Sequence, residues 1–201
     1  MKDYLDFLIT GNLATDIQRY FLKYDNLGTY EHTIDVINEL SYIKKHFGHI
    51  QSGSLIACYC HDLGRVVRSD EILEFCLQNN IMVSDEEKIL PSILHQKISC
   101  FIAENVFKVN DTTILNAVKY HTTLRKNPSM TEIEVFLADK MSWKEEEYRE
   151  LAQRIKETLK EGKEKAIYYY LCDLHDKKEK LKLYHSDSKE AFQYFNQNHI
   201  L

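Results

Sequence analysis

Apolar residues recur at helical spacing along most of the chain, and no long stretch alternates apolar with polar residues as a strand would. The clearest helix is predicted from about Tyr30 to Phe47, and Gly48 is placed to end it. Its apolar face carries Ile34, Ile37, Leu40, Ile43 and Phe47. Residues 4–8 and 17–24 have the same spacing on either side of a break at Gly11. The pattern therefore predicts an all-α fold.

Several shorter helices are predicted from the residues at their starts. Ser84 is followed three positions later by Glu87, which is the sequence of a capping box. Asp111 can cap the helix that follows it, and Ser69 or Asp70 can cap a helix that reaches position 77. Further helical stretches cover 95–107, 111–120 and 131–159, the last as one long helix or a bent pair.

A nearly continuous apolar run over 55–60 predicts a segment that is buried on all sides, and it ends in the adjacent pair His61-Asp62. An ionised aspartate in such a place is costly unless it is paired or binds a metal. Neighbouring residues of a regular helix point in different directions, so both can reach one metal only if the helix ends there. Gly64 permits such an end.

Asp139 repeats this arrangement, because it follows the apolar run 135–138. Its alternative role is a buried acid paired with Lys140 or Arg65. Three histidines, His32, His95 and His121, also lie within or at the end of apolar helical stretches. A single histidine in a helical protein is more often structural than a ligand, but imidazole and carboxylate together suit a divalent transition metal.

The composition limits the class of protein. A chain of 201 residues suits one domain, predicted here over 1–201 with its core at about 28–142. The 26 basic and 31 acidic side chains give a net charge of −5, which argues against a nucleic-acid partner. Five cysteines form no paired framework, no leader is visible, and no apolar run approaches membrane-spanning length. We therefore expect a cytoplasmic protein with no membrane partner, and a homodimer is compatible with the sequence.

The ligand-type residues and their flanking segments resemble the HD-domain metal-dependent phosphohydrolases. The segments are YEHT, HDLGR, ILHQKISCFIAENVF, ILNAVKYHTT and FLAD, within about 28–142. Within that family the chain is similar to the YqeK-like group, which hydrolyses diadenosine tetraphosphate symmetrically to two ADP. The resemblance implies an all-α helical bundle with a metal site between its helices. The charge-rich sequence from Lys144 onward predicts a charged helical extension after this core.

The resemblance also implies roles for individual residues. The metal ligands would be His32, His61, Asp62 and Asp139. His95 and His121 would contact substrate phosphates or hold a second metal. The implied metal is iron, and Mn, Mg, Ni, Co or Zn also suit these ligands. Asp62 would orient or deprotonate the attacking water, Arg65 would act beside it on the phosphate, and Lys140 would contact the substrate.

Three departures from the YqeK-like pattern bear on the substrate. Arg65 stands where the family usually has lysine, and the segment 140–145 lacks the family's arginine and proline. The segment 183–188, Leu-Tyr-His-Ser-Asp-Ser, keeps only part of an Ile-His-Pro-Asp-Thr run. Two alternatives to diadenosine tetraphosphate hydrolysis therefore stay open. One is hydrolysis of a different nucleotide, such as a mono- or triphosphate or a cyclic nucleotide, and the other is non-catalytic nucleotide binding.

Overall fold

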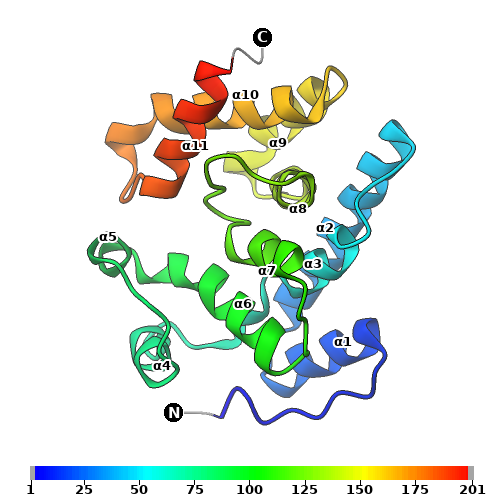
Figure 1. Cartoon of the computed structure of the whole chain (residues 1–201), viewed down its shortest axis with the longest axis vertical. Coiled ribbons are helices and arrows are strands. Elements are labelled where there is room, and N and C mark those ends of the chain that lie inside the picture. The colour runs from blue at the N-terminus through cyan, green and yellow to red at the C-terminus, as the bar shows by residue number, and fades with distance from the viewer. Residues whose placement is uncertain (1–2, 199–201) are drawn as a thin grey trace.

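Helix α2 (Leu27–Phe47) runs along one side of the molecule and packs against the deeply buried α8 (Met130–Met141) (Figure 1). The computed structural model describes residues 3–198, and all regular structure within that range is helical. The other α helices are α1 (Leu13–Lys23), α3 (Ser54–Cys60), α4 (Ile72–Gln78), α5 (Asp85–Ile89), α6 (His95–Asn105), α7 (Thr112–Lys119), α9 (Glu146–Leu159), α10 (Lys163–Asp176) and α11 (Ser186–Gln197). Short 3₁₀ helices are η1 (Leu63–Val66), η2 (Pro91–Leu94) and η3 (Lys178–Lys180).

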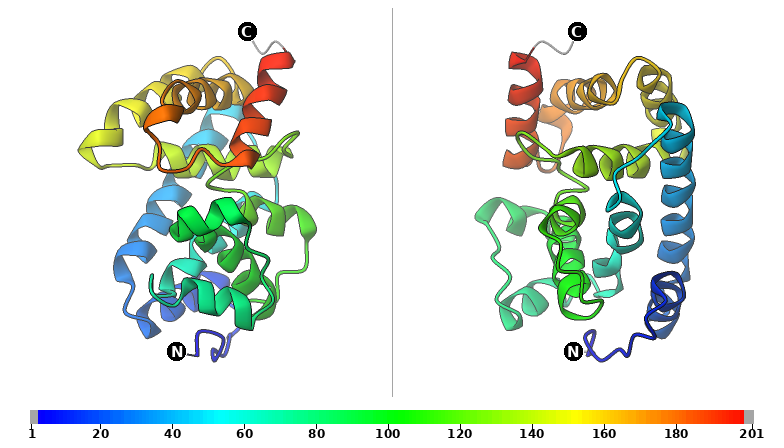
Figure 2. Two further views of the ribbon diagram at one scale, coloured as in Figure 1. Left: turned by 90° about the vertical axis from the view of Figure 1, so that its left-hand side faces the viewer. Right: turned by 45° about the vertical axis from the view of Figure 1, so that its right-hand side comes forward.

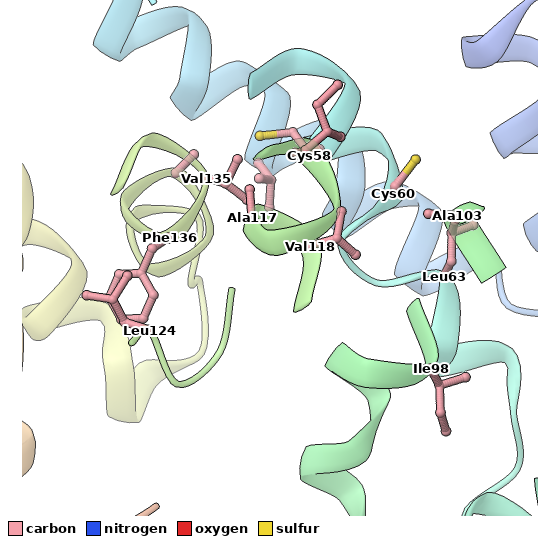
Figure 3. Close-up of a cluster of buried hydrophobic side chains, with 14 of the residues drawn as sticks. Cys58, Cys60, Leu63, Ile98, Ala103, Ala117, Val118, Leu124, Val135 and Phe136 are labelled. Atoms are coloured by element: carbon pink, nitrogen blue, oxygen red, sulfur yellow. The ribbon is translucent and has the colours of Figure 1, made fainter. Parts of the chain in front are cut away.

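The core lies where α3, α7 and α8 meet between α2 and α6 (Figure 3). Its side chains include Cys58, Ala117, Val118, Val135 and Phe136, each fully buried. The thiols of Cys58, Cys60 and Cys76 are free and buried, as the apolar surroundings indicated. Burial raises the pKa of the Cys60 thiol to about 12, so this group is inert packing.

The charged C-terminal part forms α9, α10 and α11, which pack around the side of α8 that faces away from α3 and α7 (Figure 2). The ammonium of Lys163 at the start of α10 donates to the buried carboxylate of Glu134 on α8 over 2.6 Å. His185 caps α11, because its side chain accepts from the backbone N–H of Asp187. The extension is therefore anchored to α8 as well as being a solvated charged surface.

Several local predictions are confirmed. Gly48 ends α2 with a φ of +80°, a conformation that glycine adopts without strain. Ser84 and Glu87 form the expected capping box, and Asp111 caps α7. The stretch 131–159 is a pair of helices with a break after Met141.

Three local predictions are wrong. Residues 4–8 are not helical, because their apolar pattern follows tertiary packing: Tyr4 is buried, and its carbonyl accepts from the hydroxyl of Tyr20. Leu55 lies on the outer side of α3 and is 42% exposed. Neither Ser69 nor Asp70 caps α4, since Asp70 instead binds Arg68 at 2.9 Å.

Across residues 3–198, helices long and apolar enough to cross a lipid bilayer do not occur.

Candidate metal centre

Six side chains converge from five parts of the fold on a point between α2, α6 and α8. They are His32 of α2, His61 and Asp62 at the end of α3, His95 at the start of α6, His121 in the turn after α7, and Asp139 of α8. The ligand atoms of five of them form two groups, His32 with His61 and Asp62, and Asp62 with His95 and His121, and within each group the atoms lie within 4.8 Å of one another. Asp62 belongs to both groups. The structure thus brings together all six residues that the sequence pattern selected.

The adjacent pair His61-Asp62 reaches one centre because α3 ends there. Asp62 leaves helical geometry with φ −111° and ψ 15°, and η1 follows directly. This turn lies very close to α6, since a Cβ on Gly64 would stand 2.4 Å from the carbonyl oxygen of His95. Only glycine fits that approach, so Gly64, which lies within η1, allows the turn that follows the pair to lie against α6.

Asp62 directs its two carboxylate oxygens to different histidines. Oδ2 lies 3.8 Å from Nε2 of His32 and 3.7 Å from Nε2 of His61. Oδ1 lies 3.3 Å from Nε2 of His95 and 3.4 Å from Nε2 of His121. Asp139 adds its Oδ1 to the first side, 3.1 Å from Nε2 of His32. The site therefore has two halves joined by one carboxylate.

Three of the imidazoles are fixed in the same tautomer. In each, Nδ1 lies 2.7 to 2.8 Å from the carbonyl oxygen three residues earlier in the chain, which can only accept a hydrogen bond. These pairs are His61 with Cys58, His95 with Ser92, and His121 with Val118. In the neutral ring Nε2 then carries a lone pair, and all three lone pairs point toward Asp62.

The charges of the site are set by burial and by its few cations. Burial lowers the pKa of His61 to about 4, and burial followed by Arg65 lowers the pKa of His95 well below its usual value. Burial alone would raise the pKa of Asp62. Arg65, His61 and the other histidines beside it together lower it by more than burial raises it, so the net pKa lies well below the ordinary range. Asp139 behaves in the same way beside Lys140. Two ionised carboxylates thus face the neutral imidazoles of His61 and His95. Burial lowers the pKa of His32, but the hydrogen bond to Asp139 and the charges of Asp139 and Asp62 together raise it more, so the net pKa of this ring is raised.

This donor set fits a divalent cation. Nε2 of His61 is buried and has no hydrogen-bond partner. Nε2 of His95 lies 3.1 Å from Nε2 of His121, although the tautomers place lone pairs on both atoms. Buried imidazole lone pairs that face one another or have no donor are costly, and a bound metal would satisfy them. Nitrogen and oxygen ligands of this kind suit divalent transition metals.

The centre opens into a cavity of about 380 Å³. Arg65 lies at its edge, half exposed, with Nε 3.2 Å from Oδ1 of Asp62 and Nη2 3.3 Å from Nε2 of His95. Lys140 also lines the cavity but is buried, and it donates to Asp139 over 2.7 Å and to the carbonyl of His121. A substrate contact by Lys140 stays a prediction, with one of its three N–H groups left for it.

Three side chains of the cavity lining, Thr29, Thr122 and Glu145, were missed by the sequence analysis. Thr122 places its hydroxyl 3.1 Å from Nε2 of His95, and Thr29 and Glu145 also line the cavity. Trp143 lies beside them, with its ring 4.9 Å from the ammonium of Lys140. Thr122 directly follows His121, and that adjacency was the available signal. Glu145 carried no such signal, because it stands in a charge run that is typical of an exposed helix.

Comparison with known proteins gives one family. The HD domain family model matches residues 29–154. An uncharacterised protein of Lactococcus lactis subsp. cremoris is 33% identical over 121 residues, which are 60% of this chain and 62% of that protein. A protein of Halalkalibacterium halodurans named symmetrical bis(5'-nucleosyl)-tetraphosphatase is 29% identical over 114 residues, covering 55% of this chain and 58% of that one. The matches thus span about three fifths of these relatives.

A solved structure shares the fold over nearly the whole length. It is a protein of Clostridium acetobutylicum described as a predicted HD superfamily hydrolase involved in NAD metabolism. The TM-score is 0.80, with 92% of this chain and 97% of that chain covered at 22% identity. The C-terminal helices are therefore part of the shared architecture as well as the segment that carries the six ligand-type residues.

Proposed function

The chain belongs to the HD domain family, and from that premise we propose that it is a metal-dependent hydrolase of nucleotide phosphoanhydrides or phosphoesters. The observation that carries the proposal is the double ligand group sharing Asp62, which opens into a cavity edged by Arg65. A buried cluster that is rich in acceptors beside a cation suits an ion and a phosphate together.

The residues that would hold the metal are His32, His61, Asp62 and Asp139. Iron is the first candidate, and manganese, magnesium, nickel, cobalt or zinc are the others. When bound, such an ion supplies a Lewis acid that activates water near neutral pH and polarises a phosphoryl oxygen.

The remaining site residues would act on the water and the phosphate. We assign Asp62 to orient the attacking water and accept its proton, because its carboxylate is ionised at the centre of the site. Arg65, His95 and His121 would face the phosphate oxygens. In the reaction, water forms one P–O bond, the P–O bond to the leaving phosphate breaks, and the leaving oxygen departs with the other half of the substrate.

Diadenosine tetraphosphate, cleaved to two ADP, is the substrate we propose first. It rests on the similarity to relatives that carry that enzyme name. A different nucleotide is the second candidate, favoured by the cavity wall after Asp139. There the chain contributes Trp143 and Glu145 and no arginine. Non-catalytic binding is disfavoured because every ligand-type position is filled. Cytoplasmic location, a homodimer and the lack of a nucleic-acid partner stay predictions.

A product assay tests this proposal. The metal-loaded protein is incubated with diadenosine tetraphosphate and with a panel of mono-, tri- and cyclic nucleotides, and the products are separated. ADP as the sole product supports the first substrate. Turnover of another nucleotide instead supports the second, and no turnover of any member by protein with a full metal complement contradicts a hydrolase.

The His95 and His121 pair has two roles that one variant separates. If the pair holds a second metal, His121→Ala lowers the metal content from two ions per chain to one. If it contacts phosphate alone, the same variant keeps its metal and binds ADP more weakly. Elemental analysis measures the metal content, and calorimetry measures the affinity for ADP. An unchanged metal content together with unchanged ADP affinity would assign both histidines to a structural role.

A further inference from the structure

A second cavity, of about 320 Å³, lies on the other side of Arg65. It is formed by the turn between α1 and α2, by η1 and the residues that follow it, and by the start of η2. Arg65 lines both this cavity and the one at the metal centre. The two hollows are thus neighbours that share one cationic side chain.

The wall between the cavities consists of site residues. His95 lines the second cavity, and its Nε2 is 3.1 Å from Nε2 of His121, which lines the first. Arg65 is held in this wall at three points: Nε to Asp62, Nη2 to His95, and its carbonyl to the amide of Asn26 over 2.8 Å. Only two of its three side-chain nitrogens are engaged in these contacts. A guanidinium has five N–H donors, so donors remain for phosphate oxygens.

The lining of the second cavity suits a nucleoside-sized group. Tyr24 and Ile72 supply apolar surface, while Ser69 and Ser92 supply hydroxyls. Arg68 adds a further positive charge at the exposed rim, where it pairs with Asp70, and the exposed Asp25 is the acidic residue of the lining. Small-molecule sites combine an apolar lining with a few polar groups and start at about 300 Å³. The cavity therefore offers surface to a ring and cations to a phosphate chain.

We propose that the second cavity holds the distal nucleoside of a two-ended substrate, whose phosphate chain passes Arg65 from the metal centre. This inference rests on the proposed function and adds to it a place for the second nucleoside of the first proposed substrate, a polyphosphate with a nucleoside at each end. Two cavities divided by a shared phosphate-binding side chain match such a molecule. A mononucleotide would occupy only the cavity at the metal centre.

Two variants of the second cavity test the inference. Ser69→Trp fills the cavity from an exposed position, with Ser52→Trp in an exposed turn as its matched control. Arg68→Ala removes the rim charge with little risk to folding, because its ion pair with Asp70 is exposed. Its control is Arg154→Ala, which breaks an equally exposed ion pair with Glu157 on α9.

The two ligands compared are diadenosine tetraphosphate and adenosine tetraphosphate, which carry the same number of phosphates but differ in the second adenosine. We expect Ser69→Trp to raise KM for the two-ended substrate about tenfold, or roughly 1.4 kcal/mol. The inhibition constant of adenosine tetraphosphate should stay within about twofold. Arg68→Ala should raise KM for the two-ended substrate by a smaller factor. The control variants should change neither this KM nor the inhibition constant of adenosine tetraphosphate.

An unchanged KM in both cavity variants, or an equal shift for the two ligands, overturns the inference while leaving the proposed hydrolase intact. If the wild-type protein hydrolyses no polyphosphate, the proposed function fails separately. In that case calorimetry measures the affinities of the protein for diadenosine tetraphosphate and adenosine tetraphosphate directly, and the same comparison is made between them. Wild-type affinities that are equal for the two ligands also overturn the second site, because the distal adenosine then contributes nothing.

Discussion

Two of the buried carboxylates of α8, Glu134 and Asp139, lie five residues apart, and their surroundings differ in kind. Glu134 is fully buried, and every neighbour donates to it: the ammonium of Lys163 over 2.6 Å, the hydroxyl of Ser54 over 2.5 Å, and the backbone N–H of Gln51 over 2.8 Å. Asp139 receives a donor from Lys140, and its other oxygen faces the histidines of the metal centre.

The difference separates a structural charge from a functional one. The Glu134 network is satisfied by the protein itself and joins the C-terminal helices to the core. The Asp139 side of the same helix collects ionised oxygens and imidazole lone pairs with too few donors, which an ion would complete. Changes at the two places should therefore affect different measurements, stability in one case and metal and activity in the other.

The largest expected effect is at the centre of the metal site. Asp62→Ala removes the carboxylate that belongs to both ligand groups. We therefore expect loss of metal and an activity at least about 100-fold lower, a larger effect than that of changing residues that only support the ligands. Elemental analysis and the product assay measure this. A variant that keeps its full metal content would exclude Asp62 as a ligand.

Lys163→Met should act on stability alone. It leaves the carboxylate of Glu134 buried without its cation, which costs about 3–5 kcal/mol in the free energy of unfolding. Urea unfolding measures the loss, and the metal content of the folded protein should be unchanged. Lys156→Met is the control. It breaks a half-buried ion pair with Glu39 that joins α9 to α2, and it should cost about 1 kcal/mol or less in the free energy of unfolding. Equal losses in the two variants would contradict the contrast drawn here.

Arg65→Lys should weaken substrate binding without removing metal. Lysine keeps a positive charge but loses the fork that reaches Asp62 and His95 together. Loss of a charge-assisted phosphate contact of about 1.5–3 kcal/mol raises KM by roughly 10- to 150-fold. Steady-state kinetics on metal-loaded protein measure it. Because lysine is usual at this position in the YqeK-like group, an unchanged KM would show that the charge alone is sufficient.

The smallest effect concerns His185, which is buried between α5 and α11. Burial lowers its pKa, but Glu87, Asp187 and Glu86 raise it more, so the net pKa lies above the usual 6.5, with Lys97 as the opposing charge beside Glu87. The protonated ring therefore stabilises the fold fully below about pH 6.5, and this contribution is lost as pH rises through the raised pKa.

His185→Gln should accordingly cost about 1 kcal/mol more at pH 6 than at pH 9. A protonated ring carries N–H on both nitrogens and cannot accept from Asp187, so the variant loses the pairing with the carboxylates at pH 6 and the helix cap at pH 9. Urea unfolding of both proteins at the two pH values gives the measurement. A cost that is larger at pH 9 would show that the ring acts mainly as a cap.

Local chemistry in the sequence was enough for most helices and for the six ligand-type residues. Ser84, Asp111 and Gly48 act on backbone groups a few residues away, so their effects can be inferred from neighbouring residues. His61-Asp62 at the end of an apolar run also carries its own signal, since a buried charge needs a partner.

Tertiary contacts decided the rest. Residues 4–8 have helical spacing, yet they form irregular, bent backbone because Tyr4 and Phe7 pack against α1 and its surroundings. A pairing of Lys140 with Asp139 was among the alternatives that the sequence offered, and it is present. The sequence could not indicate that Glu145 reaches the cavity or that Arg65 stands between two cavities. These facts depend on distances between helices that are remote in the chain. Residue types and local spacing determine which groups can do the chemistry, and only the packing of α2, α6 and α8 determines which of them meet.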